Sequence, residues 1–197
     1  MKKTLLLLSL CLLFLAACAT TEVYVPAATP LSPREGFLRD EDVNLVIYDG
    51  RTYREGSAEL TARIADDFRT AFPSVKLTVL PETAYYEQPR PGRITIRIGI
   101  STYAAAFGSG VSSSIGKFGG KFYYGSLPEN VWNGITGFSV TISDRRPGRD
   151  RDDSENIGKV MSMATTMGAA PAQMALSRSY AYVMKSVAGY VENVLMR

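Results

Sequence analysis

Few residues in this chain could carry catalytic or metal-binding chemistry. The 197-residue sequence contains no histidine, which removes the commonest general base and the commonest metal ligand. It contains two cysteines, Cys11 and Cys18, and both lie close to the N-terminus. Catalysis would therefore depend on carboxylates, lysine, tyrosine or serine alone. We expect a protein that is not an enzyme and that uses no metal or other cofactor.

Two glycine-rich strings have part of a functional motif but lack the rest. Five residues separate Gly110 from Gly116 and Lys117, whereas a phosphate-binding loop has four, and Phe118 stands where that loop needs Ser or Thr. Ser114 and Lys117 have the Ser-x-x-Lys spacing of penicillin-recognising hydrolases, but the surrounding glycines oppose the required helix and Lys-Thr-Gly is absent. We expect neither segment to bind a nucleotide or to act as a hydrolase.

A third string consists of methionines, at positions 161, 163 and 167. Clustered thioethers can hold Cu(I), and methionine also fills irregular apolar gaps. Without a histidine or an available cysteine to complete a copper site, packing is the favoured interpretation of Met161, Met163 and Met167.

The segment 103–133 is the strongest candidate for a binding surface. It lies between two predicted strands and is longer than most loops without secondary structure. It combines glycines with aromatic rings, which provide a large contact area with few rotatable bonds. We expect five of these residues to bind a partner or ligand: Phe118, Phe122, Tyr123, Tyr124 and Trp132. The alternative is an additional hairpin over residues 117–124 whose aromatic rings complete the core.

The charged run 144–155 alternates arginines with aspartates, so that its charges nearly cancel. This composition predicts a solvated loop. The alternative is a salt-sensitive contact with a partner.

The N-terminus has the features of a secretory signal. Lys2 and Lys3 precede an apolar run over residues 5–14, which is too short to span a bilayer. Small residues then lead into a cysteine, in the string Leu15-Ala16-Ala17-Cys18. This string resembles the lipobox of bacterial lipoproteins, in which cleavage occurs before the cysteine and its sulfur receives a diacylglycerol. The resemblance implies that Cys18 is the acylated first residue of the mature protein. The alternative is an ordinary signal peptide with an incidental cysteine.

Lipidation would determine where the mature protein resides. Two or more acyl chains on one residue hold a protein stably on a membrane, and no later apolar run is long enough for a transmembrane helix. Ala19 stands where an aspartate would mark inner-membrane retention in enteric bacteria, so the same resemblance favours the outer membrane. Removal of Lys2 and Lys3 lowers the formal net charge from +3 to about +1. A nearly neutral protein is not expected to bind nucleic acid.

The chain divides into three parts. Residues 1–17 form the signal peptide, residues 18–40 a flexible tether, and residues 41–197 a single α/β domain. Prolines in the second part, Pro26, Pro30 and Pro33, disfavour a regular helix and favour an extended chain.

The expected elements of the domain follow from hydrophobic periodicity. A buried strand over 43–48, a helix over 57–72 with Ser57 as its N-cap, and a strand over 75–80 predict a right-handed parallel unit. Two alternating strands, 94–101 and 138–143, each predict one apolar and one polar face. A long helix beginning near Pro171 closes the chain. Together they predict a two-layer α/β sandwich: a mixed sheet with a βαβ start, antiparallel strands and a long C-terminal helix.

The order of elements resembles small α/β domains of envelope accessory lipoproteins, such as the penicillin-binding-protein activators, the curli secretion lipoproteins and the TolB amino-terminal domain. The resemblance implies an accessory protein that binds an envelope protein or a second copy of itself. A glycan-binding lipoprotein that uses the aromatic segment 103–133 is the alternative.

Overall fold

The computed structural model describes residues 29–108, 127–164 and 169–197. The predicted sites at Cys18, Phe118, Phe122, Tyr123 and Tyr124 lie outside these residues, as do Gly110, Ser114, Lys117 and Met167. Within them, the elements follow in this order: β1 (Asp42–Asp49), α2 (Ser57–Ala71), β2 (Lys76–Leu80), the 3₁₀ helix η1 (Glu82–Tyr86), β3 (Ile94–Phe107), β4 (Val131–Asp144), β5 (Arg151–Ala164) and α4 (Ala169–Leu195).

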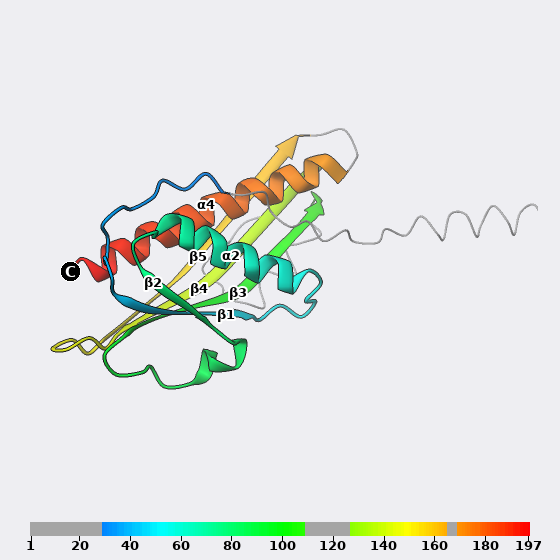
Figure 1. Cartoon of the computed structure of the whole chain (residues 1–197). Coiled ribbons are helices and arrows are strands. Elements are labelled where there is room, and N and C mark those ends of the chain that lie inside the picture. Colours follow the sequence, from blue (N-terminus) through cyan, green and yellow to red (C-terminus); the bar gives the residue numbers. More distant parts are fainter. Residues whose placement is uncertain (1–28, 109–126, 165–168) are drawn as a thin grey trace, which may run out of the picture.

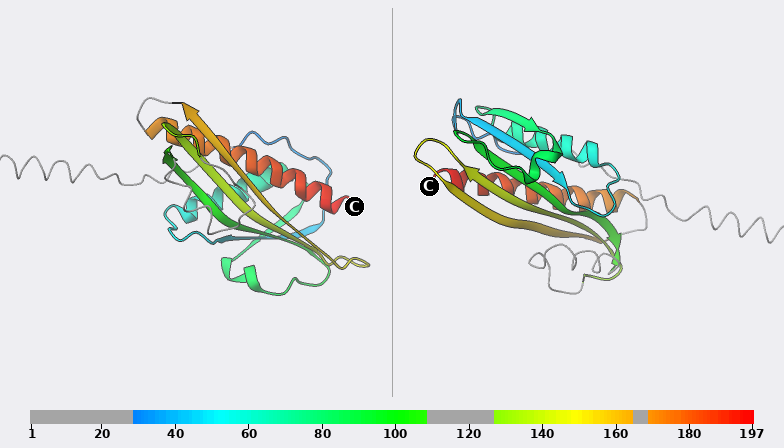
Figure 2. Two further views of the ribbon diagram at one scale, coloured as in Figure 1. Left: turned by 180° about the vertical axis from the view of Figure 1, so that it is seen from behind. Right: turned by 90° about the horizontal axis from the view of Figure 1, so that it is seen from below.

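The elements form two layers (Figure 1). The sheet has the order β2-β1-β3-β4-β5, in which β2, β1 and β3 are parallel and β3, β4 and β5 are antiparallel. Both α-helices cover the same face of the sheet, and α4 runs along β4 and β5 (Figure 2). This arrangement confirms the predicted fold class: a two-layer α/β sandwich with a βαβ start and a long C-terminal helix.

The core lies between the sheet and the two helices. Ile96, Ile98 and Ile100 of β3 are at most 1% exposed, because each points from the middle of the sheet toward the helices. Tyr180 and Val187 of α4 pack against this row and are fully buried. The period-2 pattern of the strands and the period-3.6 pattern of the helices therefore meet at one apolar interface.

Gly134 allows α4 to approach the sheet closely. A Cβ atom at this position would lie 2.2 Å from the carbonyl carbon of Ala175, which belongs to the backbone of α4. A side chain here would push the helix away from β4.

Three predicted features differ from the structure in detail. Ser57 is the first residue of α2 and not its N-cap; Gly56 takes the cap position in a left-handed conformation. The polar face of β3 is covered, since Thr95 and Arg97 are 3% and 9% exposed beneath the connection between β2 and β3. The long segment 103–133 is shorter than expected, because β3 extends to Phe107 and β4 begins at Val131.

Residues 29–40 pack against the domain, although the sequence places them in the tether. The Thr29 hydroxyl donates to Asp67 Oδ2 at 2.9 Å, Leu31 joins the core, and Arg34 pairs with Glu192 at 2.8 Å. This segment, blue in Figure 1, thus joins α2 to α4. A tether over residues 18–28 lies outside the described residues and stays a prediction.

Candidate functional site

The carboxyl ends of β1 and β2 lie where open α/β sheets commonly bind ligands. The chain leaves β1 toward α2 on one face of the sheet, and leaves β2 toward η1 on the other (Figure 1). Connections that diverge from neighbouring parallel strands leave a crevice outside the carboxyl ends of those strands. We therefore take residues 48–58 and 79–87 as the candidate site.

An arginine–aspartate pair fixes the start of the connection from β1. Asp49 is 1% exposed and accepts from Arg51 through both carboxylate oxygens: Nε to Oδ1 at 2.9 Å and Nη2 to Oδ2 at 2.7 Å. The Arg51 guanidinium also lies over the ring of Tyr103, 5.8 Å from its centroid. A bidentate pair of this kind is a strong, directional contact. Here it joins the last residue of β1 to the connection that follows, so the pair stabilises the fold.

Burial alone would raise the pKa of Asp49, but hydrogen bonds from Arg51 and Ser57 lower it below its ordinary value. Asp144 behaves in the same way, because Arg146 outweighs the effect of burial on its pKa. A carboxylate with a depressed pKa in the folded state contributes stability above its unfolded pKa, near 4, and loses that contribution as the pH falls through the folded value.

We therefore expect the thermal midpoint to stay nearly constant from about pH 7 to 5 and to fall steeply below about pH 4. Circular dichroism at a series of pH values measures this change. In Asp49→Asn protein, with the titrating group removed, the acid-induced fall should be shallower than in the wild type. An equal fall in both proteins would contradict the assignment.

Three tyrosines lie near the carboxyl end of β1, on the face of the sheet opposite the helices. Tyr48 stacks on Tyr85 with centroids 4.9 Å apart, and Tyr86 lies edge-on to both, at 5.5 and 5.1 Å. We call Tyr48, Tyr85 and Tyr86 the tyrosine cluster. Arg54 lies over the Tyr48 ring at 5.4 Å and pairs with Glu82 at 3.0 Å, which links the β1–α2 connection to η1.

The tyrosine cluster packs against β3 on its inner side and is exposed to solvent on its outer side. Tyr85 lies directly over the backbone of β3, because a Cβ on Gly99 would come within 2.6 Å of its hydroxyl. Arg97 holds the end of η1 by donating to the Glu87 carbonyl at 2.7 Å. Burial raises the pKa of Tyr85, while Arg97 opposes this effect. Tyr86 is nevertheless 75% exposed, and Tyr53 in the neighbouring connection is 82% exposed.

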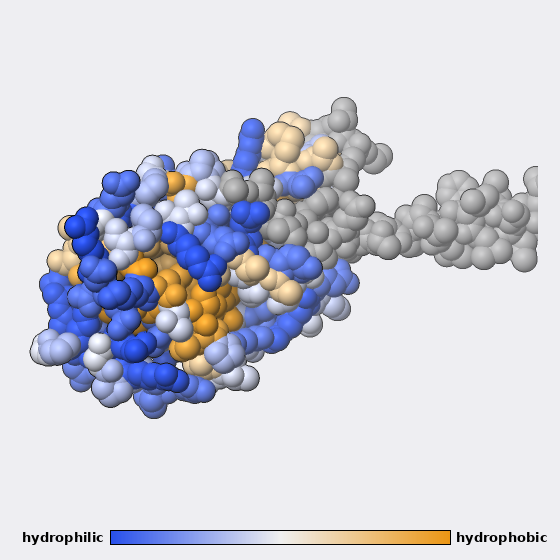
Figure 3. Space-filling view, viewed as in Figure 1, coloured by the Kyte–Doolittle hydropathy of each residue, from blue (hydrophilic) through white to orange (hydrophobic). Residues whose placement is uncertain are grey.

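A groove of 620 Å³ lies between α2 and β2, on the helical face of the sheet. Figure 3 shows an apolar area over these two elements. Val79 of β2 is 41% exposed in the groove, and Glu82, which pairs with Arg54, also lines it. The Arg54–Glu82 pair therefore links the groove to the tyrosine cluster.

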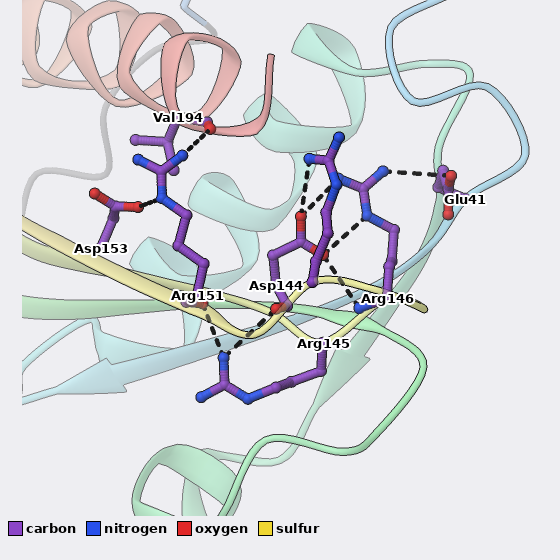
Figure 4. A network of polar contacts seen from close by, with 8 residues as sticks. Glu41, Asp144, Arg145, Arg146, Arg151, Asp153 and Val194 are labelled. Atoms are coloured by element: carbon purple, nitrogen blue, oxygen red, sulfur yellow. Dashed lines mark hydrogen bonds and ion pairs between the residues drawn. The ribbon is translucent and has the colours of Figure 1, made fainter. Parts of the chain in front are cut away.

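The charged run 144–155 comprises the end of β4, a tight turn and the start of β5, so the prediction of a solvated loop is wrong for Asp144 and for residues 151–155. Arg146 binds Asp144 with the same geometry as Arg51 binds Asp49, at 2.9 and 2.7 Å (Figure 4). Arg151 pairs with Asp153 and donates to the Val194 carbonyl, the end of α4. These arginines stabilise the turn and the helix end.

Trp132 is the described member of the predicted aromatic site. It lies on β4, is half-buried, and packs edge-on against Phe107, with centroids 5.7 Å apart. Its indole N–H is buried without a hydrogen-bond acceptor among the described residues. It belongs to the end of the sheet opposite the turn 145–150, and a binding role for it stays a prediction.

Met161 and Met163 lie on the edge strand β5, outside the buried core. The Met163 sulfur accepts from Arg178 of α4 at 3.2 Å. Met163 therefore contacts α4 at the margin of the sheet, and neither residue belongs to the buried core.

The tyrosine cluster is not apparent from the sequence. Tyr48 is the penultimate residue of a buried strand, whereas Tyr85 and Tyr86 lie in a polar connection some 37 residues later. The adjacent pair of tyrosines after Pro81 was the available signal.

Among the described residues, no group of three or more His, Cys, Asp or Glu side chains is placed to hold a metal ion. No helix in the same residues has the length and apolar character needed to span a membrane.

Comparison with known proteins gives matches at the level of structure. No protein-family model matches the sequence, and no curated protein does. Protein XCC0632 from Xanthomonas campestris, of the DUF330 family, has a TM-score of 0.49 and 8% identity, over 85% of this chain and 93% of that one. Lipoprotein GNA1162 from Neisseria meningitidis has a TM-score of 0.36 and 13% identity, over 76% and 99%. PelC from Paraburkholderia phytofirmans, a dodecamer, has a TM-score of 0.39 and 12% identity, over 82% and 90%. Similarity at this level assigns no function to the chain.

Proposed function

We propose that the protein is a lipid-anchored accessory protein of the bacterial envelope, that its role is binding and not catalysis, and that it contacts another envelope protein. The Leu15–Cys18 string supports the anchor, and Ala19, in place of the aspartate that marks inner-membrane retention, supports the outer membrane. The observation that carries the binding role is the tyrosine cluster, where Tyr86 is 75% exposed beside Arg54. Tyrosine and arginine are enriched among residues that dominate binding energy at protein interfaces.

The position of the tyrosine cluster supports this role further. Large rings contribute most to folding when they are buried, yet Tyr53 and Tyr86 remain open to solvent. Both lie beyond the carboxyl ends of β1 and β2, where the connections from these strands diverge. This is a common position for ligands in α/β proteins. A rigid aromatic surface loses little conformational entropy when a partner binds.

The binding role is tested by photo-crosslinking in intact membranes. A photoreactive phenylalanine at position 86 should form an adduct with one envelope protein, and Tyr86→Ala should reduce co-purification of that protein with the affinity-tagged chain by about tenfold or more. Position 182 is the matched control, because Tyr182 is also an exposed tyrosine, 47% accessible, but lies on α4. An adduct with glycan would favour the alternative of a glycan-binding lipoprotein. Equal capture through positions 86 and 182 would contradict the proposed site.

The anchor is tested at Cys18. Cys18→Ser protein should remain unlipidated and should appear in the soluble fraction after salt and carbonate washing, because the acyl chains that hold it on the membrane are lost. Its domain should still fold, since the core begins at Leu31. Immunoblots of the fractions and circular dichroism of the purified protein check both points. Cys18→Ser protein that stays in the washed membranes would contradict the lipoprotein assignment.

A further inference from the structure

Among the described residues, one edge of the sheet carries backbone groups without a strand partner, beside an apolar groove. In this part of the chain β2 is the terminal strand and pairs with β1 alone. The Lys76 N–H donates to the Glu41 carbonyl at 3.0 Å, so Lys76 faces β1. Because successive residues of a strand direct their N–H and C=O groups to opposite sides, Leu77 and Val79 direct theirs outward, away from β1.

The side chains of the same strand form one wall of the α2–β2 groove. The groove is lined mainly by aliphatic groups: Ile47, Ala58, Ala62, Ala65, Val79 and Leu80. The small alanines of α2 keep the helix from covering β2, which leaves Val79 41% exposed. An additional strand beside β2 would direct every second side chain into this space.

The charges around the groove are already paired. Asp66 binds Arg69 at 2.7 Å on α2, and Glu82 binds Arg54 at 3.0 Å at the other end. The two carboxylates are therefore not available to bind a cationic occupant. The two arginines are likewise not available to bind an anionic one. The electrostatics therefore match an uncharged occupant.

We propose that β2 and the α2–β2 groove bind an extended, uncharged segment of the partner protein as a sixth strand of the sheet, with apolar residues at alternate positions. This inference rests on the proposed function, because the Arg54–Glu82 pair links the groove to the tyrosine cluster and the two surfaces would hold one partner. Backbone N–H and C=O groups at strand spacing complement those of Leu77 and Val79, and a polypeptide supplies them in register whereas a glycan does not. The five residues of β2 correspond to a contact about 17 Å long.

The test uses the lipidated full chain in detergent and a fluorescein-labelled peptide, Thr-Val-Thr-Val-Thr-Val, as the probe. We expect the peptide to raise fluorescence anisotropy and to shift the NMR amide signals of Leu77 and Val79. The Val79→Pro variant removes an outward N–H while leaving the ladder to β1 intact, and should weaken binding at least tenfold. Val79→Ala, the matched control, keeps the N–H and should weaken binding less.

A second measurement does not depend on the folding of a variant. The same peptide, N-methylated at alternate residues on its pairing edge, should lose binding to the wild-type protein, because it can no longer donate to β2. The proposal would be overturned if the N-methylated peptide bound the wild-type protein as well as the unmodified peptide does. It would also be overturned if Val79→Pro protein bound the unmodified peptide as well as the wild type does. Binding of chitohexaose in place of the peptide would overturn it too, as would concentration-dependent dimerisation through β2 in sedimentation measurements.

The proposed function can fail separately from this inference. If the position-86 crosslink to an envelope protein persists unchanged in Val79→Pro protein, the accessory role stands and the strand addition does not. If the crosslink is absent while the peptide binds β2 as described, the groove binds an extended chain and the tyrosine cluster is not the partner site.

Discussion

Replacing Gly134 with alanine should lower the free energy of unfolding by about 3 kcal/mol. An added Cβ would lie 2.2 Å from the carbonyl carbon of Ala175 and 2.3 Å from the backbone nitrogen of Leu176. These atoms belong to the backbone of α4, in the N-terminal third of the helix, which packs along β4 and β5, so relief requires the helix backbone to shift. Urea denaturation followed by circular dichroism measures the effect.

Gly99→Ala is the matched control, since it adds the same methyl group to the neighbouring strand. There the Cβ would lie 2.6 Å from the hydroxyl of Tyr85, the far end of a side chain that can rotate toward solvent. We expect a cost of about 1 kcal/mol, together with a displaced tyrosine cluster. Similar costs at Gly99 and Gly134 would show that α4 adjusts more easily than this packing implies.

The fold was predictable where one face of each element is apolar. Ile94 to Ile100 alternate regularly, and α2 repeats an apolar residue every four positions, so the burial of these elements follows from their period. β5 was not predicted, because its first half, residues 151–156, is polar and lies at the edge of the sheet. Such a strand buries too little surface to leave a hydrophobic pattern.

The candidate site was less accessible to sequence analysis, because it depends on contacts between distant segments. Tyr48 meets Tyr85 only once the β2–β3 connection crosses back over the sheet. Thr29 likewise reads as part of a proline-rich tether until Asp67 and Tyr180 are brought beside it. The Leu15–Cys18 string, by contrast, is local, so its resemblance to a lipobox is visible in the sequence alone, and Cys18 lies outside the described residues.

The second large effect is expected from Arg51→Met, which should destabilise the protein by about 3 kcal/mol. The side chains of Asp49 and Arg51 are 0% and 10% exposed, so the substitution leaves a buried carboxylate without its main counter-charge. Arg54→Met is the control, because Arg54 and Glu82 are 46% and 42% exposed and their pair should contribute less than about 1 kcal/mol. Thermal and urea denaturation at pH 7 measure both variants.

The double variant Asp49→Asn/Arg51→Met separates the loss of the pair from the cost of an isolated charge. If the buried carboxylate causes the instability, removing both charges should restore part of the stability lost in Arg51→Met protein. The Arg51→Met protein should also become more stable as the pH falls toward 5, because the pKa of an unpaired buried carboxylate rises and protonation then relieves the charge. Wild-type protein should not gain stability over this range, since Arg51 keeps the pKa of Asp49 below its ordinary value. A double variant less stable than Arg51→Met, with no gain at lower pH, would mean that Arg51 acts through its packing on Tyr103 and not through its charge.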